Sequence, residues 1–311
     1  LANVFASDQD ITVNTDGTLH IKTGLQSVDT ITNSGIVNLD DTLIVRILTN
    51  NVAATFNQQA NITSTDAIIN GTWNVEGEGN VNYTRVLNTT TLSGDANVIL
   101  KDYVNGSTTT SSNLKINQSG TSTFDGSIVG TGFVEKTGLG TLKISDAQTF
   151  TGGLNVTGGT FEALSGGTLA DTVAIHVSKD STFIAGAADT VGSVLVDAIG
   201  SGTTEGLFTM NANITTQGDF TNNGTLALNA DLTTGDADSS NGTNNDFINN
   251  GTTTLIANRT ITTEGGLVGA TTGIVNVNNT GTTLTLNQTG DTTYSGKIQG
   301  AGNFVKTGTG S

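Results

Sequence analysis

The chain has 311 residues, of which 34% are apolar, with 41 glycines and neither proline nor cysteine. Its 11 basic and 27 acidic residues give a net charge of −16, which disfavours nucleic acid and anionic membrane surfaces as partners. The lack of cysteine excludes disulfides, thiolate zinc sites and thiol catalysis. The sequence contains no run of 18 apolar residues, so it does not predict a membrane-spanning helix.

The first residues have two interpretations. Val4-Phe5-Ala6 before Ser7 has the small-residue spacing of a signal-peptidase site, with Ala6 as the last residue removed. An ordinary frayed terminus explains the same residues.

From residue 17 onward a five-residue pattern recurs: glycine, then Thr or Ile, then apolar, variable and apolar residues. Its instances begin at Gly17, Gly35, Gly71, Gly140, Gly159, Gly224 and Gly273. The alternation predicts half-buried strands, and the leading glycine is expected to supply the turn. A spacing of roughly 18 to 25 residues suits one coil of a solenoid, which must stack on its neighbours to bury its apolar face.

Proline is absent because, in a stacked strand, every N–H is needed for pairing. The corners are then expected at residues that tolerate positive φ, as in Asn222-Asn223-Gly224 and Asn249-Asn250-Gly251. We predict an all-β parallel β-helix with Gly- and Asn-rich turns, forming a single domain over residues 1–311. The apolar run Leu43–Leu48 predicts either a buried strand or an N-terminal capping element within residues 1–60.

Acidic pairs are the strongest candidates for catalysis, because many β-helix enzymes cut polysaccharides with carboxylates on one face. The pairs are Asp40 with Asp41, Glu76 with Glu78, and Asp236 with Asp238. No basic cluster or aromatic subsite accompanies them, which favours solvated charges. The two histidines, His20 and His176, lie at outward positions of predicted strands without a second histidine at ligand spacing.

Aromatic residues form a second stripe, which could stack on sugars or fill the core. Core packing is favoured, because several of them fall on inward positions. The phenylalanines are Phe124, Phe133, Phe150, Phe161, Phe183, Phe208, Phe220 and Phe247. Tyr83 and Tyr103 are better surface candidates, whereas Tyr294 aligns with Phe124 and is expected to be structural.

Residues 114–141 align without a gap to residues 284–311, with 13 of 28 positions identical. The first copy continues through Lys136-Thr137-Gly138-Leu139-Gly140 to Thr149-Phe150-Thr151-Gly152-Gly153. This stretch resembles the passenger-associated repeat of bacterial type V autotransporters. The Asn- and Thr-rich texture is also similar to that of the rickettsial surface cell antigens, which are adhesins.

The resemblance implies a right-handed parallel β-helix on the surface of a Gram-negative cell, either released or anchored to the outer membrane by a C-terminal barrel that this chain does not include. It carries no functional residues, and we predict no catalytic, cofactor-binding or metal-binding residue. The expected function is a non-enzymatic adhesin for a host protein or glycan, or for an identical passenger on a neighbouring cell. The alternatives are a polysaccharide-active enzyme and a passive spacer for another functional unit.

The polar stretch Gly235–Asp246 is the predicted protruding loop and the first candidate for partner binding. Its candidate residues are Asp236, Asp238, Asn241, Asn244, Asn245 and Asp246. The segment differs from a calcium loop because Phe247 stands where a bidentate glutamate is required.

Overall fold

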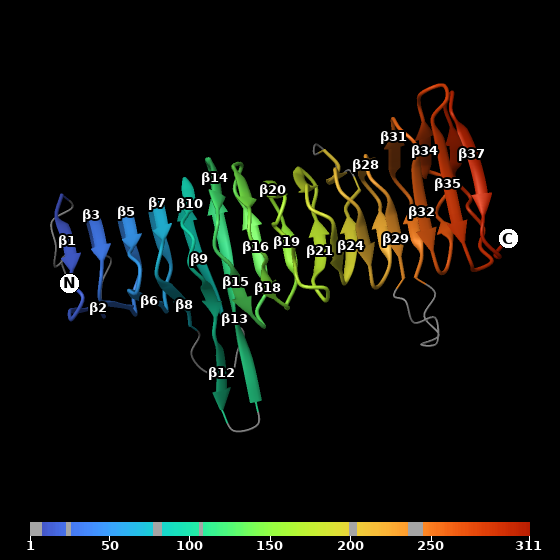
Figure 1. Ribbon diagram of the computed structural model, residues 1–311. Helices are drawn as coiled ribbons and strands as arrows, with labels where there is room; N and C mark the ends of the chain where they lie inside the picture. The colour runs from blue at the N-terminus through green and yellow to red at the C-terminus, as the bar shows by residue number, and fades with distance from the viewer. Residues whose placement is uncertain (1–7, 23–25, 77–82, 106–107, 199–203, 236–244) are drawn as a thin grey trace. The chain divides into compact units, whose positions relative to one another are not determined.

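The computed structural model describes residues 8–22, 26–76, 83–105, 108–198, 204–235 and 245–311, and every regular element among them is a β-strand. Strands that neighbour each other in the sheets are parallel and follow chain order (Figure 1). One pair is antiparallel, β12 (Asp102–Asn105) with β13 (Thr108–Gln118). The predicted all-β parallel β-helix is confirmed. The contacts within the chain group into two units, Leu1–Gly153 and Leu154–Ser311.

The first unit contains two long sheets whose strands alternate along the chain. One consists of β1 (Asp10–Val13), β3 (Gln26–Asn33), β5 (Leu43–Asn50), β7 (Ile62–Ile69), β9 (Tyr83–Thr89), β13 and β16 (Val134–Thr137). The other consists of β2 (Thr18–Ile21), β4 (Ile36–Leu39), β6 (Thr55–Gln58), β8 (Thr72–Val75), β11 (Val98–Leu100), β15 (Ile128–Gly130) and β18 (Thr149–Phe150). In addition, β10 (Thr91–Ser93) pairs with β7, and β14 (Thr121–Phe124) pairs with β17 (Thr141–Ile144).

The second unit has three sheets, so each coil contributes up to three strands. The first contains β19 (Leu154–Val156), β21 (Ala174–Val177), β24 (Ser193–Val196), β27 (Phe220–Asn222), β30 (Phe247–Asn249) and β33 (Leu267–Val268). The second contains β20 (Gly159–Ala163), β22 (Ser181–Ala185), β25 (Leu207–Met210), β28 (Thr225–Leu228), β31 (Thr252–Leu255), β34 (Ile274–Val277) and β36 (Lys297–Gln299). The third contains β23 (Asp189–Val191), β26 (Ile214–Thr216), β29 (Leu232–Thr234), β32 (Arg259–Thr263), β35 (Thr283–Gln288) and β37 (Asn303–Thr307).

Coil length varies more than the sequence spacing predicts. The shortest register offset is 17 residues, between β3 and β5, and the longest is 30 residues, from Val98 to Ile128. The longest coil is the one that contains β12. Extra length therefore leaves the stack as an excursion, and the strands before and after it keep their register.

The interior is filled by stacked side chains of successive coils. Phe161, Phe183 and Phe208 lie one above the next, with ring centroids 5.7 and 4.8 Å apart. Seven of the eight phenylalanines of the predicted stripe are buried, whereas Phe133 is half-buried. The interpretation of this stripe as core is thus confirmed for all but Phe133, and stacked aromatic pairs stabilise the coils beyond the area they bury.

Buried asparagines form ladders at the corners of both units. In the first unit, Asn33 Nδ2 donates to Asn50 Oδ1 at 2.8 Å, and both side chains are fully buried. In the second unit, Asn222 Nδ2 donates to Asn249 Oδ1 at 2.9 Å. The amides also donate to backbone carbonyls of the coil above, such as that of Thr72, so the side-chain N–H groups of these ladders have acceptors.

Several strand-initial glycines have a reason other than the predicted turn, whereas Gly159, with a φ of 63°, has the backbone conformation of a turn glycine. Gly251 does not have a positive φ, but a Cβ there would lie 2.1 Å from the Gly224 carbonyl oxygen of the preceding coil. A Cβ at Gly35 or Gly140 would likewise lie 2.3 or 2.1 Å from a carbonyl oxygen of the preceding coil. Glycine is therefore required by the close approach of stacked backbones.

The apolar run at Leu43–Leu48 lies within β5, which pairs with β3 on one side and β7 on the other. Leu43, Val45 and Leu48 are buried. Of the two predicted roles, buried strand or terminal cap, the structure shows the strand.

Candidate interaction surface

The predicted partner-binding loop is described only at its end. Asn245 is buried, and its Nδ2 donates to the Gln217 carbonyl at 2.8 Å. Asp246 Oδ1 accepts from the Gly266 N–H at 2.9 Å, and burial raises the pKa of this carboxyl. These two residues anchor the segment to adjacent coils. Asp236, Asp238, Asn241 and Asn244 lie outside the described residues.

The described acidic candidates Asp40 and Asp41 both have partners close to them. Asp40 Oδ2 lies 2.7 Å from His20 Nε2, and Asp41 Oδ1 accepts from the Thr42 N–H at 2.7 Å. Glu78 lies outside the described residues. His20 is exposed, and His176, which pairs with Asp197 at 3.0 Å, is half-buried, so both face outward as predicted.

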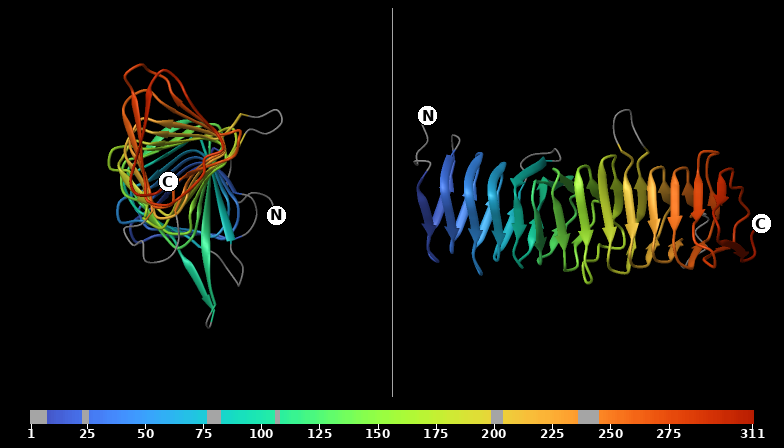
Figure 2. Two further views of the ribbon diagram at one scale, coloured as in Figure 1. Left: turned by 90° about the vertical axis from the view of Figure 1, so that its right-hand side faces the viewer. Right: turned by 90° about the horizontal axis from the view of Figure 1, so that it is seen from above.

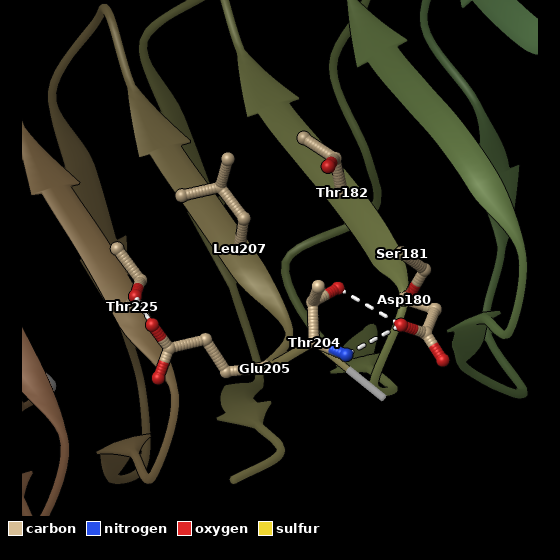
Figure 3. A pocket seen from close by; sticks show the side chains of 7 residues that line it. All are labelled: Asp180, Ser181, Thr182, Thr204, Glu205, Leu207 and Thr225. Carbon is tan, nitrogen blue, oxygen red and sulfur yellow. Dashed lines mark hydrogen bonds between the residues drawn. The ribbon is translucent and has the colours of Figure 1, made fainter. Parts of the chain in front are cut away.

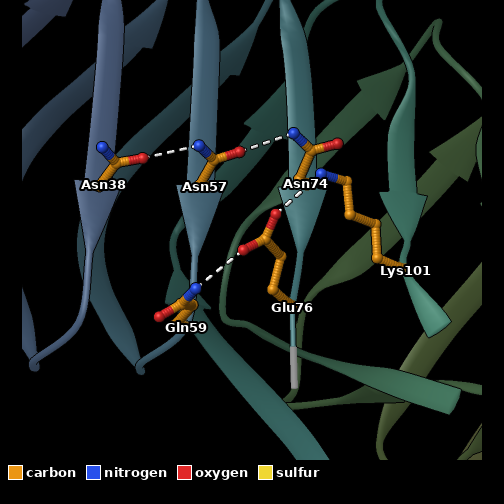
Figure 4. A network of polar contacts seen from close by, with 6 residues as sticks. All are labelled: Asn38, Asn57, Gln59, Asn74, Glu76 and Lys101. Atoms are coloured by element: carbon orange, nitrogen blue, oxygen red, sulfur yellow. Dashed lines mark hydrogen bonds and ion pairs between the residues drawn. The ribbon is translucent and has the colours of Figure 1, made fainter. Parts of the chain in front are cut away.

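Glu76 belongs to a polar network on the outer side of the first unit (Figure 4). Its two carboxylate oxygens accept from Lys101 Nζ and Gln59 Nε2, each at 2.8 Å. Beside them the amides of Asn38, Asn57 and Asn74 form a chain of hydrogen bonds of 2.7 Å across β4, β6 and β8. These hydrogen bonds connect neighbouring coils, and both carboxylate oxygens of Glu76 are used in them, one in the ion pair with Lys101.

The tyrosines were predicted to fall into two groups, with Tyr294 structural and Tyr83 and Tyr103 on the surface. Tyr294 OH accepts from Asn249 Nδ2 at 2.9 Å, and burial raises the pKa of its phenol, which confirms a structural role. The side chains of Tyr83 and Tyr103 lie outside the described part of the structure.

A pocket of about 300 Å³ on the second unit brings together Asp180 and Glu205 with Leu207 (Figure 3). Asp180 has a φ of 58°, and its Oδ1 accepts from the N–H and hydroxyl of Thr204 at 2.6 and 2.9 Å. Glu205 accepts from the Thr225 hydroxyl at 2.5 Å. Figure 3 shows Thr204 between the two carboxylates, and each of them accepts from a different threonine, Asp180 from Thr204 and Glu205 from Thr225.

The third sheet of the second unit carries a row of uncharged polar side chains on its outer face. Thr215 of β26, Thr233 of β29 and Thr262 of β32 occupy successive register positions and are half-buried. The row begins at Thr190 of β23 and continues through Asn287 to Thr307. We call these six residues the threonine column.

Two hollows adjoin the threonine column and share Thr215. One, of about 350 Å³, is lined by Thr190 together with Asp171 and Asp189. The other, of about 310 Å³, is lined by Thr233, Thr262 and Asn287 together with Glu264. The surface therefore offers regularly spaced hydroxyl groups beside a few carboxylates.

Asp189 is the most perturbed carboxyl on this surface. Burial raises its pKa to about 6, and Asp171 acts in the same direction. Its two oxygens accept from the N–H groups of Leu169 and Thr190 at 2.8 and 2.9 Å, which fixes its orientation. Sequence patterns did not indicate this residue, because one of its partners, Leu169, lies 20 residues earlier in the chain.

The antiparallel pair of the first unit is the clearest excursion from the stack. Strand β12 and residues 108–111 of β13 form a ribbon that projects from the parallel strands, as Figure 1 and the left view of Figure 2 show. The sequence did contain a signal, because Gly106-Ser107 between two strand-forming segments is typical of a two-residue hairpin loop.

Comparison with known proteins yields no relative: no family model, curated protein or solved structure matches this chain. Among the described residues there is no helix that could cross a membrane, and no group of three or more His, Asp or Glu side chains that could hold a metal ion.

Proposed function

We propose that this chain is a non-enzymatic adhesin of the autotransporter passenger type, exposed on the surface of a Gram-negative bacterium. In this proposal it reaches the cell surface by type V secretion and is held at the outer membrane, or released from it. Its partners are a host cell-surface protein or glycan, or the same protein on a neighbouring cell.

The observation that carries the proposal is the threonine column with its two hollows. Hydroxyl and amide groups repeat once per coil along it, and no charged residue interrupts the row. A hydroxyl both donates and accepts hydrogen bonds, so the column can bind the hydroxyl groups of a glycan or the polar groups of a protein. Each contact is weak, but display of many copies on a cell raises the total avidity by orders of magnitude.

The distribution of charged groups is consistent with this proposal. Asp40 and Glu76, which were candidates for catalysis, form contacts between coils. Among the described residues, the carboxylates that line the two hollows are those of Asp171, Asp189 and Glu264, at the margins of the threonine column.

Beads coated with this chain test the proposal on host cells and on bacterial cells. We expect them to bind at least 5-fold better than beads coated with an unrelated acidic β-helix, by the avidity argument. Equal binding of the two bead types would count against adhesion.

Asp189 and Asp171 favour a second candidate, a polysaccharide-active enzyme. A carboxyl with a raised pKa beside a second carboxylate is the arrangement that glycoside hydrolysis uses. Release of reducing sugar from a polysaccharide panel, abolished in both Asp189→Asn and Asp171→Asn, would support the enzyme over the adhesin.

A further inference from the structure

Three corners of the described chain carry the same residues, asparagine, glycine and threonine. They are Asn70-Gly71-Thr72 in the first unit, and Asn223-Gly224-Thr225 and Asn250-Gly251-Thr252 in the second. At each corner the asparagine follows a strand of one sheet, and the threonine begins a strand of the next. Asparagine before glycine is especially prone to deamidation, because glycine has no side chain to keep its nitrogen away from the asparagine amide. A difference in reactivity between these corners is therefore expected to come from the structure.

Deamidation joins two groups that lie next to each other in the chain. The backbone nitrogen of the glycine loses its proton to the solvent and attacks Cγ of the asparagine. A C–N bond forms, and the side-chain amide takes a proton from water and leaves as ammonia. Water then opens the cyclic imide at either carbonyl, which gives aspartate or isoaspartate. The asparagine side chain has to turn towards its own backbone, so hydrogen bonds that hold the amide or the glycine N–H slow the reaction.

In the second unit the amide of Asn250 is held at both ends. Its Nδ2 donates to Asn223 Oδ1 at 2.9 Å, and its Oδ1 accepts from the Ala270 N–H at 2.8 Å. The Gly251 N–H, whose nitrogen would attack, donates to the Asn222 carbonyl at 2.9 Å. Three hydrogen bonds would have to break before the ring can close, and each slows the reaction by roughly 2- to 10-fold.

The corresponding corner of the first unit is bonded differently. Asn51, which precedes Asn70 by one coil, donates from Nδ2 to Ser34 Oγ at 2.9 Å, so this row of hydrogen bonds runs away from Asn70. Among the described residues, the side-chain amide of Asn70 has no hydrogen-bond partner. Asn70 and Asn250 are both half-buried, so access of water does not distinguish them. The restraint on the amide does.

Isoaspartate at residue 70 would not fit the corner. It adds one atom to the main chain beside Gly71, where even a Cβ would lie 2.1 Å from the Asn51 carbonyl oxygen. Both products also add a carboxylate to a chain of net charge −16. Because closely packed backbones tolerate little extra volume, we expect this coil to lose contacts with its neighbours.

We propose that Asn70 is a site of spontaneous deamidation in the folded chain, and that the hydrogen-bonded asparagine ladder protects Asn250 from the same reaction. The modification consumes only water, and it limits how long the first unit keeps its native stacking. The inference does not rest on the proposed adhesin function, because it concerns the purified chain alone.

Peptide mapping by mass spectrometry tests the proposal. The purified chain is kept in mildly alkaline buffer, either folded or unfolded in urea, and aspartate and isoaspartate are quantified at residues 70 and 250 over time. In the folded chain we expect reaction at Asn70 to be about 10-fold faster or more, because of the three hydrogen bonds that hold the other corner. In urea the two rates should become similar. Equal rates in the folded chain, or the same ratio in urea, would overturn the proposal.

Two variants separate the role of the ladder from overall stability. Asn223→Ala removes the acceptor of Asn250 Nδ2 and should speed the reaction at Asn250 by about 3-fold, with the rate at Asn70 unchanged. Asn70→Gln should lack the slow loss of thermal stability that the wild-type chain shows on incubation, because the longer side chain forms a cyclic imide far more slowly. An unchanged rate at Asn250 in Asn223→Ala, or an equal loss of stability in Asn70→Gln, would contradict the proposal.

Discussion

Lys136 and Lys306, 170 residues apart, occupy equivalent positions and make equivalent hydrogen bonds. Lys136 Nζ donates to the carbonyls of Thr137 and Gly140 at 2.9 and 3.0 Å, and Lys306 Nζ donates to those of Thr307 and Gly310. The glycines two positions later, Gly138 and Gly308, have φ values of 78° and 83°. The Lys-Thr-Gly repeat is thus a turn whose carbonyls are capped by the lysine.

Replacement of Lys136 by Met should destabilise the first unit by about 2 kcal/mol, because it leaves three carbonyls without their donor. Lys306→Met is the matched control and should cost below about 0.5 kcal/mol, since Lys306 is exposed, whereas Lys136 is fully buried. Urea unfolding of the three proteins measures the difference. Equal losses in the two variants would show that the buried lysine has no special role.

The same lysine should make stability depend on pH. Burial lowers the pKa of Lys136 from 10.5 to about 8, so between these pH values the unfolded chain binds more protons than the folded chain. The free energy of unfolding should therefore rise between pH 8 and 9.5, by about 1 kcal/mol from this group. Lys136→Met should lack this gain. Identical slopes for wild type and variant would contradict the assignment.

The asparagine ladders should differ in importance between the interior and the surface. Asn50→Ala removes the acceptor of Asn33 and a bond to the Thr72 carbonyl inside the core, and should cost about 2 kcal/mol. Asn57→Ala breaks the half-buried amide chain on the outer side and should cost below about 1 kcal/mol. Thermal unfolding of both variants measures the two losses of stability. A larger loss of stability in Asn57→Ala than in Asn50→Ala would contradict the greater importance of the buried ladder.

Close approach of coils makes the strand-initial glycines sensitive to a single methyl group. Gly251→Ala would place Cβ 2.1 Å from the Gly224 carbonyl oxygen and should cost about 3 kcal/mol. Gly218→Ala is the control, since its nearest contact is 3.1 Å, and it should cost below about 1 kcal/mol. Comparable unfolding midpoints would mean that the coils can separate to admit a side chain.

The sequence predicted the fold because its pattern is local. The alternation after Gly35 or Gly224 indicates a strand, the register follows from burial of one face, and the inward phenylalanines stack as expected. The site was harder to predict, because the threonine column joins one residue from each of six coils. Only the pairing register shows that Thr215, Thr233 and Thr262 lie side by side.

Two local features were interpreted incorrectly or overlooked for physical reasons. Strand-initial glycine is also a common turn residue, so the sequence did not indicate that Gly251 is needed for contact between coils. The β12 ribbon was overlooked although Gly106-Ser107 is a hairpin signal, because Thr108-Thr109-Thr110 resembles the threonine-rich parallel strands elsewhere in this chain.

The most direct test of the proposed adhesin is binding of beads to host and bacterial cells after the threonine column has been changed. The test variant carries Thr215→Asp, Thr233→Asp and Thr262→Asp, which add three negative charges at half-buried outer positions of the threonine column. The control variant carries Asn38→Asp, Asn57→Asp and Asn74→Asp, which add the same number of charges to the first unit. Both are compared with wild type at equal bead density and after folding has been verified by circular dichroism. We predict that the threonine variant loses at least 5-fold in binding whereas the asparagine variant keeps most of it, because the contacts lie on the threonine column. Equal binding by all three proteins, or an equal loss in both variants, would contradict the proposed role of this surface.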